Sequence, residues 1–283
     1  MSYAGGAAQH ADAYGEVSAS FSGGAIITAA GSADTKGSYV ELVASTPFDA
    51  SGMLVAVGPQ PAANWGNEGL IDIAVGAATE EVLIPNLVES GSFWSGSHNT
   101  GQGGYHYFPV AIPAGTRIAA RWQSNVANAP TAVVVYLFQG GNLFGPGFQR
   151  VEACGVQPGT NSLASEIDPG GTANAKGAVK ELIASTAFDY HALHIAFTSL
   201  GQATASSKTW LVDLQIGAST EQVIIPNLFF GSGTGGVFGH GYPVLAVTVP
   251  FYIPQGTRIS AKCQSNDNTS GTRKIGLAVY GIG

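Results

Sequence analysis

A long internal repeat constrains the fold of this sequence more than any other feature. Residues 112–125, IPAGTRIAARWQSN, return as IPQGTRISAKCQSN at residues 253–266, and the two segments differ at four of their fourteen positions. Other segments recur at nearly the same shift: residues 36–49 at 176–189, 71–77 at 212–218, and 84–87 at 225–228. Solenoid repeats are far shorter than this shift. The repeat therefore indicates the tandem duplication of a whole domain.

Each half has the alternating pattern of half-buried strands. Ile118, Ala120 and Trp122 fall on one face of the repeated segment, and Arg117 and Arg121 fall on the other. Sustained helical periodicity is absent, and the short apolar runs are separated by Gly, Pro, Asn and Ser. The sequence predicts an all-β protein of two tandem antiparallel β-sandwich domains with jelly-roll-like topology. An immunoglobulin-like sandwich is the alternative.

The repeat also predicts the domain boundaries. Residues 24–141 and 158–283 are expected to form the two jelly-roll-like domains. Residues 1–23 are small and polar, which favours a flexible N-terminal arm. Residues 142–157, rich in Gly and Pro, are expected to form a linker.

Composition argues against several classes of partner. The chain has 11 Lys and Arg residues and a net charge of −7, so it lacks the basic surface that binding to nucleic acid requires. No apolar run is long enough for a transmembrane helix, so membrane insertion is not expected. The first residues lack a basic start and an apolar run, so no signal peptide is expected and the chain is expected to be made in a cytosol.

Few residues suggest a metal, a cofactor or a nucleophile. Cys154 and Cys263 are expected to be free thiols, because two cysteines cannot form a disulfide framework or a zinc site by themselves. His191 and His194 have a spacing that places them on opposite faces of a strand, which argues against a shared metal. Motifs of serine hydrolases, phosphate-binding loops and dinucleotide-binding folds are absent from the sequence. No cofactor and no metal are expected.

Charged residues that occur at equivalent positions in both halves are candidates for maintaining the fold. They are Asp72 and Asp213, Glu41 and Glu181, Glu80 and Glu221, and Arg117 and Arg258. A catalytic pair of carboxylates among them remains an alternative. Turn bonds, charges at strand edges and salt bridges explain them more simply, so we expect that the protein is not an enzyme.

The segments that differ between the halves are candidates for recognition. Residues 88–110 and 229–251 are rich in Gly and aromatic residues, and a third loop surrounds Trp65. Aromatic rings stack on sugars, and His and Asn bond to hydroxyl groups. The candidate ligand-binding residues are Trp65, Phe93, Trp94, His98, Asn99, Tyr105, His106, Tyr107, Phe238, His240 and Tyr242. The alternative is that these aromatic residues pack on their own domain or on a neighbouring subunit.

The repeated motifs also carry a family likeness. FDASG followed by an apolar run, DIAVGAATEEVLIPNL and IPAGTRIAARWQSN together resemble a domain of virion surface proteins of tailed phages and phage-derived gene transfer agents, of the head spike or head fibre type. The likeness spans residues 36–140 and 176–281. In the second half FDYHA replaces FDASG, and Cys263 replaces Trp122. No binding residue is transferred by this resemblance, because the shared motifs lie in strands and turns.

The resemblance implies a protein of the particle surface, made in the bacterial cytoplasm. It suggests a spike that attaches the particle to host cells by binding capsular polysaccharide without catalysis. It also implies a homo-oligomer, either a trimer or a pentamer, and contact with a capsid or spike-base protein through the N-terminal arm. A purely structural capsid decoration or tail protein is one alternative, and a polysaccharide-degrading enzyme is another.

Overall fold

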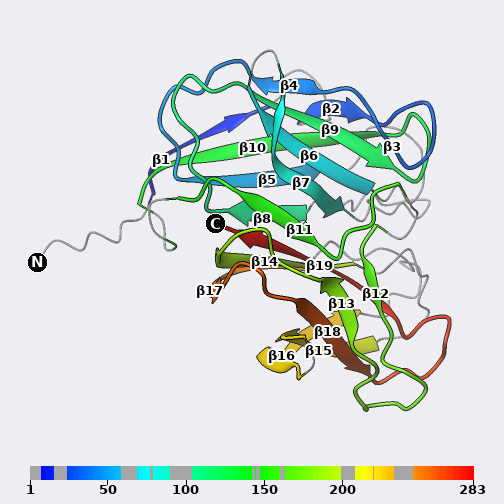
Figure 1. Cartoon of the computed structure of the whole chain (residues 1–283). Helices are drawn as coiled ribbons and strands as arrows, with labels where there is room; N and C mark the ends of the chain where they lie inside the picture. The colour runs from blue at the N-terminus through cyan, green and yellow to red at the C-terminus, as the bar shows by residue number, and fades with distance from the viewer. Residues whose placement is uncertain are drawn as a thin grey trace, which may run out of the picture.

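The computed structural model describes residues 8–15, 24–58, 69–76, 79–89, 104–141, 144, 147–159, 163–198, 208–218, 220–232 and 245–283. The described residues contain strands and turns and no helix, so none of them forms a helix that could cross a membrane. Figure 1 shows two layered β-sandwiches, one formed by each half of the chain.

Two sheets form the first sandwich. The sheet that we call the β1 sheet has the order β1-β10-β5-β8, with β2 also paired to β10: β1 (Ala8–Tyr14), β10 (Pro130–Gly140), β5 (Gly52–Gly58), β8 (Gly104–Phe108) and β2 (Ala25–Thr28). The β3 sheet has the order β3-β9-β6-β7, with β4 also paired to β9: β3 (Thr35–Lys36), β9 (Ile118–Ser124), β6 (Gly69–Val75), β7 (Glu81–Glu89) and β4 (Val40–Val43).

The second sandwich repeats this plan. Its β11 sheet has the order β11-β19-β14-β17, with β12 also paired to β19: β11 (Val151–Cys154), β19 (Ile275–Ile282), β14 (Tyr190–Thr198), β17 (Leu245–Ile253) and β12 (Ser165–Ile167). Its β13 sheet has the order β13-β18-β15-β16: β13 (Lys180–Ile183), β18 (Ile259–Ser265), β15 (Lys208–Ile216) and β16 (Gln222–Ser232).

Both strand orders are those of a jelly roll. Each sheet alternates early and late strands of its half, as two interlocked Greek keys require. All strand pairs between the named strands are antiparallel. The predicted all-β fold with duplicated jelly-roll-like sandwiches is therefore confirmed, and the immunoglobulin-like alternative is not observed.

The repeated turns are held by repeated contacts. The Thr46 hydroxyl donates to the carbonyl of Pro113 at 2.7 Å, and the Thr186 hydroxyl donates to that of Pro254 at 2.9 Å. Gly37 recurs as Gly177 because a side chain there would lie within 1.9 Å of the Thr28 carbonyl oxygen. These contacts explain why the motifs recur while the cores differ.

The structure differs from the predicted arm and linker. Residues 8–14, within the predicted flexible arm of residues 1–23, form β1 and pair with β10. Residues 151–154, within the predicted linker of residues 142–157, form β11 and pair with β19. Gly15 and Gly155 follow these strands with φ of 87° and 74°, and a side chain at either position would lie 2.9 Å from a carbonyl oxygen of the central strand. The two segments are thus equivalent first strands of the two sandwiches.

A shared core joins the two sandwiches. On β14, Leu193 and Ile195 face the core of the second sandwich, whereas the alternate residues Ala192 and Ala196 pack against the core of the first. On β19, Tyr280 also faces the first core. The β11 sheet of the second sandwich therefore covers the open edge of the first, where β7 and β8 lie (Figure 1).

Candidate functional site

Most of the predicted binding residues lie outside the described part of the chain. These are Trp65, Phe93, Trp94, His98, Asn99, Phe238, His240 and Tyr242. Their role stays a prediction. The other three, Tyr105, His106 and Tyr107, lie on β8.

Strand β8 does not present its three candidate residues on one face. Tyr105 is 65% exposed, whereas His106 is completely buried on the opposite face. Tyr107 shares the outer face with Tyr105 and packs against Phe138 and Phe144, with ring centroids 6.0 and 6.1 Å away. Burial raises the pKa of Tyr107. His106 is therefore not placed to contact a ligand from solvent, and Tyr105 is the most accessible of the three.

His106 instead belongs to a buried polar chain between the two sandwiches. Its Nε2 lies 2.7 Å from Glu89 Oε1, and its Nδ1 lies 2.9 Å from Nε2 of His194. His194 Nδ1 lies 2.9 Å from the Thr248 hydroxyl, which donates to the carbonyl of Tyr107 at 2.6 Å. Five residues from both halves are thus connected without solvent.

The bond from the Thr248 hydroxyl to the Tyr107 carbonyl determines where the protons lie along this series of hydrogen bonds. Because Thr248 donates to a carbonyl, its oxygen accepts from Nδ1–H of His194, so His194 Nε2 accepts from Nδ1–H of His106. His106 Nε2 and Glu89 then share one proton. Burial, and then the charge of His106, hold the pKa of His194 well below its usual 6.5, so His194 is neutral.

The polar chain also fixes the ends of a predicted recognition loop. Glu89 ends β7, and Gly104 begins β8, so the two residues border residues 90–103. A side chain at Gly104 would lie 2.2 Å from Glu89 Oε1, so the carboxylate fits there only beside glycine. Sequence comparison of the halves gave no signal for Glu89, because its counterpart is Phe230.

The candidate loops of both sandwiches begin and end on the same side of the molecule. Thr248 of β17 contacts Tyr107 of β8, and further along β8 Phe148 bridges to Val110 and stacks on His191. Strands β8 and β17 therefore run side by side in the same direction. Their first residues border residues 90–103 and 233–244, and Val57 at the end of β5 pairs with Gly104.

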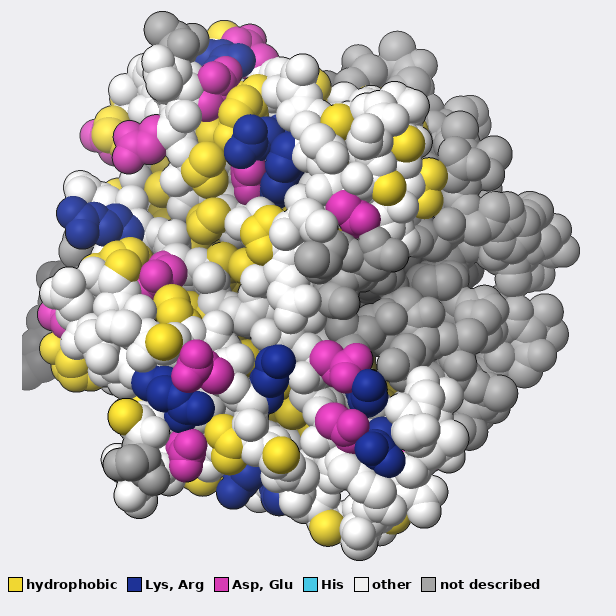
Figure 2. Space-filling view, turned by 45° about the vertical axis from the view of Figure 1, so that its right-hand side comes forward, with side chains coloured by type: hydrophobic (Ala, Val, Ile, Leu, Met, Phe, Trp, Pro, Cys, Tyr) yellow, Lys and Arg dark blue, Asp and Glu magenta, His cyan; other side chains and the backbone are white. Residues whose placement is uncertain are grey.

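The charged residues kept in both halves form ion pairs within each sandwich. Arg117 lies 2.8 Å from Glu41 and 3.2 Å from Glu80. The equivalent Arg258 pairs with Glu181 at 2.7 Å and Glu221 at 3.1 Å. Figure 2 shows charged side chains gathered in small groups of opposite sign. These contacts support the interpretation that this set maintains the fold.

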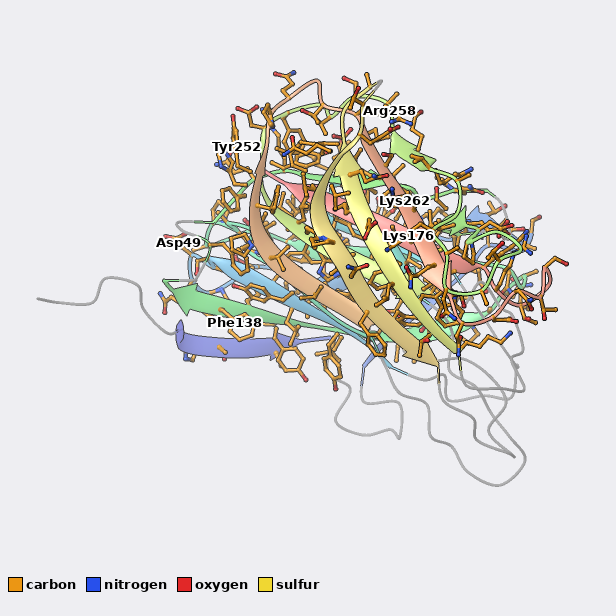
Figure 3. The ribbon with its side chains drawn as sticks, turned by 90° about the horizontal axis from the view of Figure 1, so that it is seen from below. Asp49, Phe138, Lys176, Tyr252, Arg258 and Lys262 are labelled. Atoms are coloured by element: carbon orange, nitrogen blue, oxygen red, sulfur yellow. The ribbon has the colours of Figure 1, made fainter. Side chains whose placement is uncertain are left out.

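The kept aspartates hold a bulge of the outer strand. Asp72 accepts from Lys36 at 2.8 Å, from Arg121 at 2.8 Å and from the N–H of Asn86 at 2.8 Å. Burial alone would raise the pKa of Asp72, but Lys36, Asn86 and Arg121 together lower it. Burial also lowers the pKa of Lys36, to about 8. Asp213 likewise accepts from Lys176 at 2.8 Å and from the N–H of Asn227 at 2.9 Å. Figure 3 shows Lys176 near Lys262 of β18.

The predictions for the cysteines and histidines agree with the structure. Cys154 and Cys263 are free and buried, and burial raises the pKa of each thiol to about 12. His194 is buried, whereas His191 on the opposite face of β14 stacks on Phe148. Among the described residues, no group of three or more His, Cys, Asp or Glu residues could hold a metal ion.

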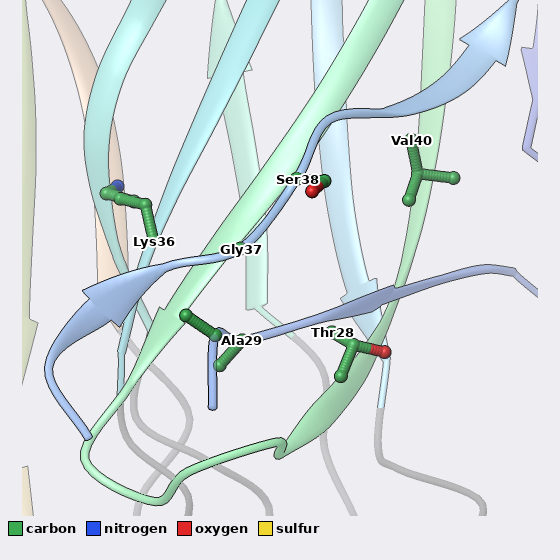
Figure 4. A pocket seen from close by; sticks show the side chains of 7 residues that line it. Thr28, Ala29, Lys36, Gly37, Ser38 and Val40 are labelled. Carbon is green, nitrogen blue, oxygen red and sulfur yellow. The ribbon is translucent and has the colours of Figure 1, made fainter. Parts of the chain in front are cut away.

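An open groove of about 430 Å³ lies on the first sandwich. It is lined by Thr28, Ala29, Ala30, Lys36, Gly37, Ser38 and Val40, and Figure 4 shows Lys36 at one end and Val40 at the other. The ammonium group of Lys36 is already bonded to Asp72 and to the carbonyl of Leu70. The lining offers small side chains and backbone and no pair of acid and base.

Comparison with known proteins adds one distant likeness. No protein-family model matches the chain, and no curated protein matches it. Among solved structures, the N-terminal CBM22-1-CBM22-2 tandem domain from Paenibacillus barcinonensis Xyn10C is similar to it at a TM-score of 0.28 and 9% identity, over 97% of this chain and 91% of that one. A likeness at this level carries no argument about function.

Proposed function

We propose that this chain is a surface spike protein of a phage virion or gene transfer agent particle. It attaches the particle to host cells by binding capsular polysaccharide, and it does not cleave the polysaccharide.

The observation that carries this proposal is the common side on which the strand ends that border the candidate segments lie. The described strand ends Gly58, Gly104 and Leu245, which border residues 59–68, 90–103 and 233–244, lie on one side of the two sandwiches. The shared core fixes the two sandwiches relative to each other. Variable segments attached to neighbouring strand ends of a rigid scaffold are suited to contact an extended polymer, because loops on a rigid scaffold commonly carry recognition.

Tyr105 supplies an accessible aromatic ring beside one of these segments. It lies on the outer face of β8, directly after residues 90–103, and is 65% exposed. Exposed aromatic rings stack on the apolar faces of sugars.

Binding without cleavage is supported by the state of the repeated carboxylates. Glycoside hydrolysis needs one carboxylic acid with a raised pKa facing a second carboxylate. The pKa of Asp72 is lowered, and Glu41 and Glu80 converge on Arg117. These groups are engaged within the sandwich.

The proposal is tested with the purified full chain and two isogenic bacterial strains, one encapsulated and one acapsular. We expect binding to encapsulated cells only. Tyr105→Ala should reduce binding several-fold without lowering the melting temperature. Tyr252→Ala is the matched control, because Tyr252 is 57% exposed but lies near the far end of β17 (Figure 3).

Three results would contradict the proposal. Equal binding to acapsular cells would remove the capsule as the ligand. Release of reducing ends would indicate an enzyme. Normal adsorption by particles that lack this chain would indicate a structural decoration.

A further inference from the structure

Because the two sandwiches are duplicates, each residue of the β1 sheet can be matched to its counterpart in the β11 sheet. Leu54 pairs with Tyr107 and Tyr136 across the β1 sheet. His194 pairs with Thr248 and Tyr280 at the same points of the β11 sheet. The outer face of the β1 sheet in the first sandwich is therefore the counterpart of the face of the β11 sheet that packs on the first sandwich.

These two equivalent faces have different surroundings. In the second sandwich the face is covered by β7 and β8 of the first, and Ala192, Ala196 and Tyr280 are completely buried there. In the first sandwich the face carries Leu54, Tyr136 and Phe138, which are only partly buried, and Phe138 packs on Tyr107 of the same face. This apolar face, the outer face of the β1 sheet, is covered by no strand of the described chain.

The edge of the first sandwich formed by β7 and β8, which covers the second sandwich, also has an uncovered counterpart in β16 and β17. Val88 on β7 and His106 on β8 are completely buried, whereas their counterparts Phe229 on β16 and Val247 on β17 are 63% and 41% exposed. The edge formed by β16 and β17 is thus an apolar surface equivalent to one that is buried inside the chain. Each chain exposes both halves of an interface that it already forms once internally.

We propose that a second copy of this chain docks head to tail, with its β16 and β17 edge against the outer face of the β1 sheet. The junction repeats the internal contact between the sandwiches. Because the contact joins two different surfaces, successive copies form a ring where the rotation closes. The junction would also cover Tyr105, because its counterpart Ala246 packs against the core of the first sandwich. The Tyr105 test of the proposed function is therefore made in the monomeric Val247→Asp variant.

The two residues that would meet at the centre of the proposed junction are compatible with each other. Internally His106 faces His194 at 2.9 Å, a polar pair. At the junction the equivalent pair is Val247 and Leu54, so both members are apolar. A substitution of one member alone would have left the facing ring nitrogen of the other histidine without its partner.

One hydrogen-bonding group is kept at both places. The Tyr280 hydroxyl donates to the carbonyl of Asn86 and accepts from the N–H of Val88, each at 2.8 Å. Its counterpart Tyr136 keeps the hydroxyl, and among the described residues no side-chain hydrogen bond to it is formed. Asn227 has φ of 52°, as Asn86 has 51°, so β16 keeps the bulge that would present its carbonyl to Tyr136 of the next copy.

Some exposed residues of the β16 and β17 edge lie outside the proposed junction and can serve as controls. Val82 and its counterpart Val223 are 38% and 40% exposed, so this position stays exposed in the internal contact as well. Val223 therefore lies outside the proposed junction, and Val223→Asp is a matched control for Val247→Asp.

Sedimentation of the full chain, with mass determination, tests the proposal. The wild type and Val223→Asp should form the same oligomer, whereas Val247→Asp and Leu54→Asp should each be monomers with unchanged circular dichroism. An equimolar mixture of the two monomeric variants should give a dimer, because each retains the surface that the other lacks. Tyr136→Phe should weaken association about tenfold, as expected for loss of a hydrogen bond at a buried interface.

A monomeric wild type would overturn the proposal, as would dissociation by Val223→Asp. Failure of the mixture to form dimers would also overturn it, because the contact would then not be head to tail. Should Leu54→Asp fail to fold, Tyr136→Phe still decides, since unchanged association of that variant contradicts the predicted contact. None of these measurements involves polysaccharide, so their failure is distinct from failure of the proposed function.

Discussion

His194 is a residue through which pH acts on the stability of this structure. His194 faces His106 of β8, Thr248 of β17 and the ring of Tyr280 on β19, and Glu89 is reached through His106. The pKa of His194 is lowered by burial and then by His106. Its unfolded form therefore binds a proton more readily than its folded form.

The free energy of unfolding should consequently decrease as the pH falls below about 6.5, by up to about 1.4 kcal/mol per pH unit for one proton. Above the unfolded pKa this contribution is fully retained. Urea unfolding between about pH 7.5 and 5 measures the slope. His194→Gln should flatten it, and His191→Ala, which changes a histidine on the opposite face of β14, should not. The same slope in His194→Gln would contradict the assignment.

Single-residue predictions succeeded where both halves carry the same residue. Asp72 and Arg117 were predicted to maintain the fold, and each lies in an ion pair that its counterpart repeats. The prediction of His106 as a ligand contact did not match its burial. Its partners are Glu89 and His194, and no pattern within one half could indicate a contact between halves.

At the level of elements, the strands with clear alternation were predictable and the first strand of each sandwich was not. In strand β9 the core-facing residues Ile118, Ala120 and Trp122 alternate with Ala119, Arg121 and Gln123. Strands β1 and β11 have the sequences AQHADAY and VEAC, which lack such a pattern. Their place in the sheet is fixed by pairing with β10 and β19 rather than by large side chains.

Deletion of residues 1–14 should therefore destabilise the first sandwich, because β10 would lose the backbone partners that β1 supplies over residues 135–140. Deletion of residues 1–7 leaves β1 intact and is the control. We expect the melting temperature to fall by several degrees in the longer deletion and to be unchanged in the shorter one. A dispensable arm would give equal melting temperatures for both deletions.

At the level of the whole molecule, the two sandwiches behave as one body because they share a core. Duplication predicted two domains, but the way they join depends on the outer face of β14. There Ala192 and Ala196 are small enough for close approach to the first sandwich, and Tyr280 on β19 bonds to the backbone of β7. Small residues on an outer face are also common at exposed positions, so the sequence alone could not indicate this contact.

Differential scanning calorimetry of the full chain tests the shared core most directly. We predict a single transition whose calorimetric and van't Hoff enthalpies agree, because neither sandwich can unfold without exposing the apolar surface of the other. Two separable transitions, one for each half, would contradict a shared core.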